Sequence, residues 1–149
     1  MNRNRREIIL ETLSLIHMKS RLKQDTISNH TKSAINITRE WQDRIKTKLN
    51  DFSIEKELYE DSHEKIDAID LLEKTAYELK VSGKNPHHEF YKDIFKVLIY
   101  NEEHPNEKIK TFVFITEKEG VEVLEERSKR IISFVKDKHN LDIEFEAIP

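Results

Sequence analysis

The sequence predicts an α/β domain in which helices flank a mixed central sheet. Blocks of apolar residues with the 3.6-residue period of a helix alternate with blocks of strand-like two-residue period. In the second half of the chain the two kinds of block exchange repeatedly, which is typical of parallel strands joined by helices. The chain has 149 residues, only two Gly, and no linker or internal repeat. We therefore expect a single domain over residues 1–149.

Two helices are predicted before the first strand, over residues 5–22 and about 34–50, joined by a polar connection at 25–33. Each helix repeats apolar residues every third or fourth position, which gives it one apolar face. These stripes are Ile9, Leu13 and Ile16 in the first helix and Ile37, Trp41, Ile45 and Leu49 in the second. We treat residues 1–33 as an N-terminal helical extension and residues 34–149 as the core.

Three strands follow. Residues 52–58 alternate apolar and charged side chains, which favours a strand over a continued helix. Residues 65–70 and 75–81 are two further strands, and only a few residues around 72–74 separate them. Such a short connection predicts an antiparallel hairpin.

The remaining elements alternate between helix and strand. Residues 85–100 form a helix in which Asn85 is suited to cap the start and Pro86 to occupy the first position. Thr111–Thr116 is a continuous apolar run and is typical of an interior strand. After Gly120 a further long helix is expected, and residues 142–148 alternate as in an edge strand. The buried stripe expected for this last helix is Val121, Leu124, Ile131, Phe134 and Val135.

Composition excludes several classes of protein. The absence of Cys removes disulfides, thiolate zinc sites and thiol catalysis. No apolar run approaches twenty residues and the first residues lack the apolar core of a signal peptide, so we expect a cytoplasmic protein with no membrane partner. Residues 1–50 carry a net charge of +6 and the rest −9. The basic part suits a polyanionic partner, although a solvated helical surface explains the same charges.

The hairpin carries side chains suited to metal-assisted chemistry. If its turn is centred between Leu72 and Glu73, Asp67 lies opposite Glu78 with Cβ atoms about 4.5–5.5 Å apart. Carboxylates so close repel each other unless a cation lies between them, and Mg²⁺ binds one or two carboxylates together with phosphate oxygens. Lys80 shares the strand face of Glu78 and is placed to act on a metal-bound water. A ladder of Lys and carboxylate side chains on an exposed sheet is the alternative without chemistry.

A longer pattern surrounds this trio. It comprises a helix with Glu40, an acid-rich strand at 54–58, Asp67 in Lys65-Ile66-Asp67-Ala68-Ile69, and Tyr77-Glu78-Leu79-Lys80-Val81, followed by the helix at 85–100 and the strand at 111–116. In this αβββαβ order the segment from about residue 38 to 116 resembles the PD-(D/E)xK nuclease superfamily. Ile66 stands where the name of the family has Pro.

The resemblance implies a restriction endonuclease-like αβββαβ core, with an extra N-terminal helix, that acts as a DNA endonuclease dependent on Mg²⁺, with Mn²⁺ as a substitute. Asp67 and Glu78 would hold the metal, with the Leu79 carbonyl as a third ligand. Lys80 would position the attacking water, and Glu40 would supply a second-metal or outer carboxylate.

Further basic residues are candidate contacts to DNA. Lys84, His87, His88 and Lys92 lie around a helix start, where backbone N–H groups attract phosphate, but exposed surface residues have the same composition. The basic residues of the N-terminal extension either contact phosphates or accompany a helix that packs on a second subunit. These are Arg3, Arg5, Arg6, Lys19, Arg21 and Lys23.

The nuclease interpretation has consequences for the partners of the protein, and two other functions are alternatives to it. Cutting both strands of a duplex usually needs two active sites, so a homodimer or a subunit of a larger nuclease assembly is expected. The first alternative is a non-catalytic subunit of nuclease fold that binds DNA or supports assembly, although the intact trio argues against it. The second is a small helical DNA-binding regulator that uses residues 5–50.

Overall fold

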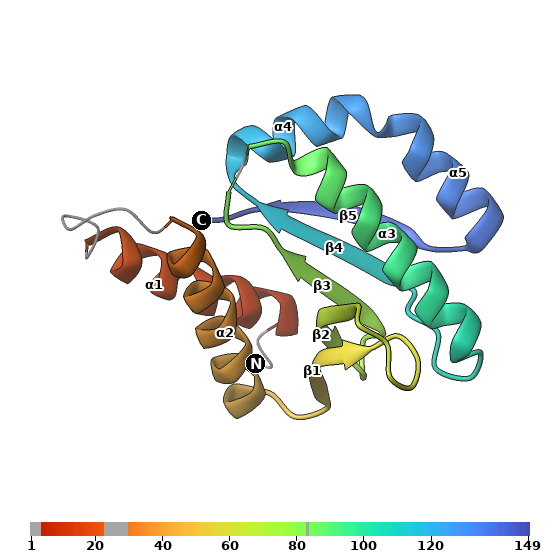
Figure 1. Ribbon diagram of the computed structural model, residues 1–149, viewed down its shortest axis with the longest axis horizontal. Coiled ribbons are helices and arrows are strands. Elements are labelled where there is room, and N and C mark those ends of the chain that lie inside the picture. Colours follow the sequence, from red (N-terminus) through yellow and green to blue (C-terminus); the bar gives the residue numbers. More distant parts are fainter. Residues whose placement is uncertain (1–3, 23–29, 83) are drawn as a thin grey trace.

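The computed structural model describes residues 4–22, 30–82 and 84–149, and within them the chain forms five helices and one five-stranded sheet (Figure 1). In chain order these are α1 (Arg5–Leu22), α2 (His30–Lys48), β1 (Phe52–Glu57), β2 (Lys65–Asp70), β3 (Thr75–Leu79), α3 (Pro86–Glu103), β4 (Thr111–Thr116), α4 (Lys118–Arg127), α5 (Lys129–His139) and β5 (Asp142–Ala147). The predicted α/β class with a mixed sheet flanked by helices is confirmed.

The sheet has the strand order β1-β2-β3-β4-β5. The first three strands are antiparallel, whereas β4 runs parallel to β3 and β5 parallel to β4. Ala68 pairs with Tyr77 and Asp70 with Thr75, so the hairpin has the predicted register, with its turn centred between Leu72 and Glu73. Thr111–Thr116 is interior and the last strand lies at an edge, as predicted.

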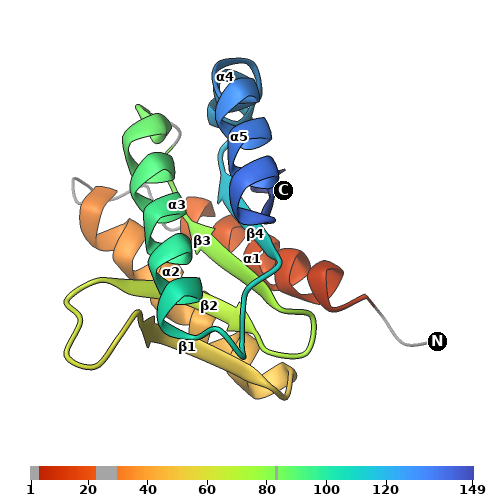
Figure 2. The same ribbon diagram turned by 90° about the vertical axis from the view of Figure 1, so that its right-hand side faces the viewer.

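Helices cover both faces of the sheet (Figures 1 and 2). α1 and α2 pack on one face, where Ile9, Trp41 and Tyr77 belong to one buried cluster. α3, α4 and α5 pack on the other, where Ala76 contributes to a second cluster. Side chains alternate along β3, so Glu78 lies on the same face as Ala76, under α3.

Several local predictions are wrong. α2 begins at His30 instead of about residue 34, β3 ends at Leu79 instead of 81, and α4 begins at Lys118, before Gly120. The long helix expected after Gly120 is divided at Ser128, whose backbone angles of −105° and 5° end α4 and begin α5. The break changes the direction of the helix, so Phe134 is 57% exposed instead of buried. Asn85 adopts a left-handed conformation and its side chain makes no capping bond to the described backbone, although Pro86 does start α3.

The N-terminal extension is fastened to the sheet by two arginines. Nε of Arg5 lies 2.7 Å from Oδ2 of the fully buried Asp70, and its guanidinium lies 5.3 Å from the ring centroid of Phe52. Arg6 pairs with Glu144 at 2.7 Å. Both arginines therefore form ion pairs with carboxylates of the protein itself, which does not support their predicted role as phosphate contacts. Of the other predicted contacts, Arg3, Lys23 and the Arg21 side chain lie outside the described residues, as does most of the 25–33 connection.

No helix among the described residues is both long enough and apolar enough to cross a lipid bilayer.

Candidate functional site

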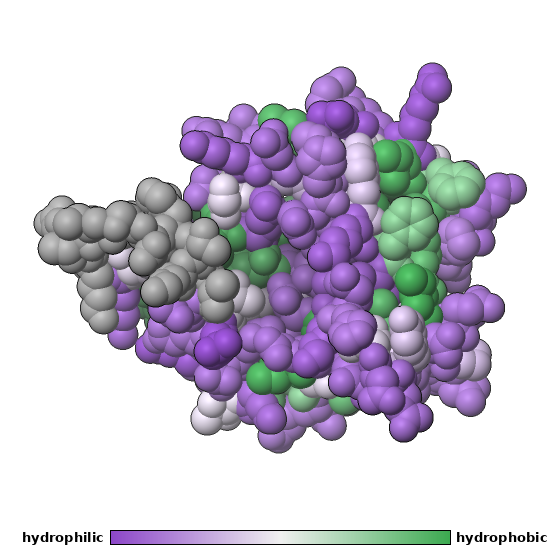
Figure 3. Space-filling model, viewed as in Figure 1, coloured by the Kyte–Doolittle hydropathy of each residue, from purple (hydrophilic) through white to green (hydrophobic). Residues whose placement is uncertain are grey.

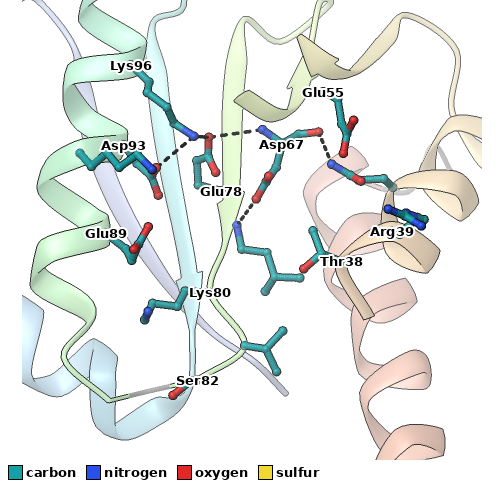
Figure 4. Close-up of a pocket in the computed structure, with 14 residues that line it drawn as sticks. Thr38, Arg39, Glu55, Asp67, Glu78, Lys80, Ser82, Glu89, Asp93 and Lys96 are labelled. Carbon is teal, nitrogen blue, oxygen red and sulfur yellow. Dashed lines mark hydrogen bonds and ion pairs between the residues drawn. The ribbon is translucent and has the colours of Figure 1, made fainter. Parts of the chain in front are cut away.

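A pocket of about 420 Å³ opens where β3 leaves β2, between α2 and α3 (Figure 4). Its floor comes from the strands and from the residue that follows β3, and it includes Glu55, Asp67, Glu78, Leu79 and Lys80. One wall belongs to α2, with Thr38, Arg39 and Gln42, and the other to α3, with Glu89, Lys92, Asp93 and Lys96. The structure therefore brings the predicted trio of Asp67, Glu78 and Lys80 to one pocket.

Asp67 and Glu78 are joined by reciprocal bonds to backbone. The Asp67 N–H donates to Oε1 of Glu78 at 3.3 Å, and the Leu79 N–H donates to Oδ2 of Asp67 at 2.9 Å. The regular β2–β3 pairing ends at Ala68 and Tyr77, and carboxylates replace carbonyls as acceptors beyond that point. Gln42 of α2 donates to the Asp67 carbonyl at 2.9 Å and ties this wall to the floor. The two carboxylates are thus held by main chain in a fixed relation.

Lys96 of α3 contacts the Glu78 carboxylate, together with Asp93 of its own helix (Figure 4). Its Nζ lies 2.6 Å from Oε1 of Glu78, 3.1 Å from Oδ1 of Asp93 and 2.6 Å from the Lys65 carbonyl oxygen. Three acceptors use all three N–H donors of the ammonium. Glu78 is 4% exposed, Asp93 6% and Lys96 8%, so the group is a buried charge cluster.

The cluster has more negative than positive groups. Burial raises the pKa of Glu78 well above its ordinary value, and the nearby Asp67 and Asp93 raise it further. Burial also raises the pKa of Asp67, and it raises the pKa of Asp93 to about 7. Burial alone would lower the pKa of Lys96, but the Glu78 and Asp93 carboxylates outweigh it and raise that pKa. One ammonium thus faces three carboxyl groups, an excess of acid that a divalent cation would neutralise.

We expect these raised pKa values to make the metal-free protein lose stability as pH rises from about 4 to 7. In that window the buried carboxyls keep protons in the folded state, whereas in the unfolded state they ionise near pH 4. Because the folded state then binds more protons, the free energy of unfolding falls with rising pH. Melting temperature measured in EDTA should fall by roughly 5 °C or more.

The matched control is Asp93→Asn, which removes the group whose pKa is about 7. Its melting temperature should depend less on pH between 5 and 7 than that of the wild type. Equal pH dependence in both proteins would contradict the assignment.

The donor set suits one hard divalent cation. Asp67 and Glu78 offer carboxylate oxygens. The Lys80 N–H donates to the Ile115 carbonyl of β4 at 2.9 Å, so the planar trans peptide points the Leu79 carbonyl the other way, toward the β2 side where Asp67 lies. Two carboxylates, one carbonyl and water molecules form a typical Mg²⁺ ligand set. Among the described residues, no three His, Cys, Asp or Glu side chains are arranged to hold a metal by themselves.

Lys80 and Glu55 flank this donor set. Lys80 is half-buried, is directed toward α3, and its ammonium makes no ion pair with the part of the chain that the structure describes (Figure 4). Glu55 lies beside Asp67, on the neighbouring strand β1. Its φ of 47° is in the left-handed region, which is strained for a residue with a side chain. Among the described residues, it is the one with positive φ inside a strand.

Other predicted site residues lie elsewhere. Glu40 is exposed on α2, pairs with Arg44 at 2.6 Å and does not line the pocket. Lys92 lines the pocket, is half exposed and lies 3.5 Å from Glu64. The rings of His87 and His88 lie at the start of α3, tilted by 45° with centroids 4.1 Å apart, and exposed Lys84 precedes them. These three lie near the pocket but outside its lining.

The sequence analysis missed the buried pair Asp93 and Lys96, as well as Arg39, Gln42 and Glu55 of the pocket lining. Asp93 follows Phe90 by three positions and precedes Val97 by four, which places it on the buried face of the helix. A carboxylate inside an apolar stripe needs a partner, and Lys96 is three positions away. That combination was visible in the sequence and is the signal that could have identified the pair.

A scan against protein-family models finds no match to the chain, and searches of curated proteins and of solved structures find no significant match.

Proposed function

We propose that this protein is a metal-dependent DNA endonuclease of the PD-(D/E)xK type. The observation that carries the proposal is the convergence of Asp67, Glu78 and Lys80 on one pocket, with the two carboxylates fixed by reciprocal hydrogen bonds. The chain order supports it as well. Three antiparallel strands, a helix, and a fourth strand parallel to the third follow α2, which is the αβββαβ order expected for a restriction endonuclease-like core.

Asp67, Glu78 and the Leu79 carbonyl would hold Mg²⁺, or Mn²⁺ in its place. The bound ion would supply a water of lowered pKa and would stabilise charge on the phosphate. Lys80 would donate a hydrogen bond to the attacking water or to a phosphate oxygen, since its ammonium has no ion partner among the described residues. Glu55 lines the pocket beside Asp67 and takes the outer-carboxylate role that the sequence suggested for Glu40.

Basic side chains near the pocket are placed to hold the nucleic acid backbone. Arg39 stands on the α2 wall and Lys92 on the α3 wall, and both are exposed. A phosphodiester chain that passes between the two helices would meet a cation on each side. Lys84, His87 and His88 would extend this path toward the start of α3.

One observation favours a non-catalytic subunit of the same fold. The Lys96 ammonium already contacts Glu78 and Asp93, so the pocket has one internal counter-charge without a metal. A protein that used the pocket only as a structural or DNA-binding element would keep such a cluster and show no cleavage.

The deciding experiment is plasmid and oligonucleotide cleavage by the purified protein in Mg²⁺, Mn²⁺ or EDTA, compared with Lys80→Ala. We expect nicking or cutting that requires metal and that falls by about 10²–10⁴ in Lys80→Ala, the range for loss of a positioned proton-transfer group. Lys110→Ala is the matched control, because Lys110 is exposed and precedes β4, at the end of the sheet away from the pocket.

Cleavage that Lys80→Ala and Lys110→Ala retain equally would contradict the assigned site. Salt-sensitive DNA binding by the wild type without any cleavage would favour the non-catalytic subunit.

A further inference from the structure

The outer face of α3 exposes large apolar side chains. Phe95 is 65% exposed and Ile99 40%, and Phe134 of α5 is 57% exposed. Figure 3 shows apolar side chains gathered on the part of this view where Figure 1 places α3 and α5. Between them, Leu98 and Ile131 are partly buried and pack on the core cluster of this side of the sheet. An exposed apolar patch of this kind is typical of a protein interface.

Four exposed residues of α3 lie in a row across this face. Lys92, Phe95, Ile99 and Glu102 are spaced by three, four and three positions, so they follow one side of the helix. The row starts with a cation, continues with two apolar residues and ends with an anion. Read from its other end it has the same spacing, with the charges exchanged.

The self-complementary order of charged and apolar residues in this row favours a second copy of the same chain as the partner of this face. If two copies of α3 pack antiparallel around a two-fold axis near Val97, Lys92 faces the partner's Glu102 and Phe95 faces the partner's Ile99. Each copy then places a carboxylate opposite the partner's Lys92, which within its own chain has the exposed Glu64 at 3.5 Å, and the apolar residues meet in the centre. An unrelated partner has no reason to match a row that is complementary to itself.

We propose that the Lys92–Glu102 face of α3 is a homodimer interface in which α3 packs antiparallel against a second copy of this chain. The inference does not rest on nuclease activity. Lys92 lines both this face and the pocket, whereas the other pocket residues of α3, Glu89, Asp93 and Lys96, lie on the neighbouring side of the helix. Dimerisation therefore leaves the α3 wall of each pocket next to the interface.

The first test is the mass of the full chain in solution, by light scattering after size exclusion and by sedimentation equilibrium. The wild type should have twice the mass of one 17.8 kDa chain at tens of micromolar. Phe95→Ser should weaken dimerisation at least a hundredfold, because each dimer loses two central aromatic rings. Its far-UV circular dichroism should be unchanged, since this ring packs little within the chain.

The control is Leu15→Ser, which alters a 52% exposed apolar residue of α1, on the opposite face of the sheet, and should leave the dimer intact. A wild type that stays monomeric, or a dimer that Phe95→Ser does not weaken, would overturn the proposal.

A charge exchange tests the antiparallel arrangement itself. Lys92→Glu alone, or Glu102→Lys alone, places like charges opposite each other twice per dimer and should weaken association at least tenfold at low salt. The double variant Lys92→Glu/Glu102→Lys restores opposite charges and should restore association. Failure of the double variant to recover would exclude this register of the two helices.

Discussion

Asp67→Asn should abolish metal-dependent cleavage, with a loss of at least about a thousandfold, and should remove metal binding. The substitution keeps the size of the side chain and an oxygen that can accept the Leu79 N–H, so the floor of the pocket can retain its backbone bonds. It removes one of two negative charges from the proposed ligand set, and an amide is a poor ligand for a hard cation beside a single carboxylate. The effect should therefore fall on the metal rather than on the fold.

Two measurements separate these effects. Titration of Mn²⁺ by calorimetry should give saturable binding to the wild type and none to Asp67→Asn, whereas the melting temperature in EDTA should differ by only a few degrees. Asp43→Asn is the matched control, because Asp43 is an exposed carboxylate of α2 that does not line the pocket. If Asp67→Asn cuts DNA as well as Asp43→Asn does, the metal site is not at the hairpin.

Lys96→Met should cost about 3–5 kcal/mol of folding stability, the range for a buried ion pair that loses one partner. The methionine fills a similar volume but leaves Glu78 and Asp93 buried without their ammonium, and it removes the hydrogen bond from Lys96 to the Lys65 carbonyl. Protonation relieves the unpaired carboxyls, so the loss measured by urea unfolding should be smaller at pH 5 than at pH 8.

The chain contains a matched control for this substitution. Glu126 and Lys129 have the same three-residue spacing as Asp93 and Lys96, and their 3.0 Å ion pair is mostly exposed. Lys129→Met should change stability by no more than about 0.5 kcal/mol, as is usual for a surface pair. If both substitutions have equally small effects, the Lys96 cluster does not stabilise the fold.

The proposed metal site also predicts how Lys96→Met responds to Mn²⁺. A divalent cation bound at Asp67 and Glu78 would replace part of the missing positive charge, so Mn²⁺ should raise the melting temperature of Lys96→Met more than that of the wild type. An equal shift in melting temperature in both proteins would mean that the bound metal does not compensate for the lost charge of Lys96.

Local patterns were enough to predict the sheet and the hairpin. The register that sets Asp67 beside Glu78 depends only on the position of the turn. The two-residue period of the strands and the short connection between them determine that position. The break at Ser128 could not be predicted in this way, because no Pro or Gly stands there. Tertiary packing decides it.

The site was only partly predictable for a geometric reason. Periodicity places Trp41 in the core but does not say which neighbouring residue faces the pocket. The structure gives that position to Gln42, which bonds to the Asp67 carbonyl, and leaves Glu40 in solvent with Arg44. A lysine on a helix is normally exposed, so Lys96 by itself gave no signal, and only its three-residue spacing from Asp93 on the buried face of α3 could have identified it.

The left-handed backbone conformation of Glu55 affects which amino acids are favoured at position 55. A glycine at this position would avoid a conformational penalty of about 1–2 kcal/mol, so a search for more stable variants would select that replacement early. The same replacement would delete the carboxylate beside Asp67. Mutational tolerance at position 55 therefore distinguishes two selective pressures, since screening for thermostability favours glycine and screening for activity favours glutamate.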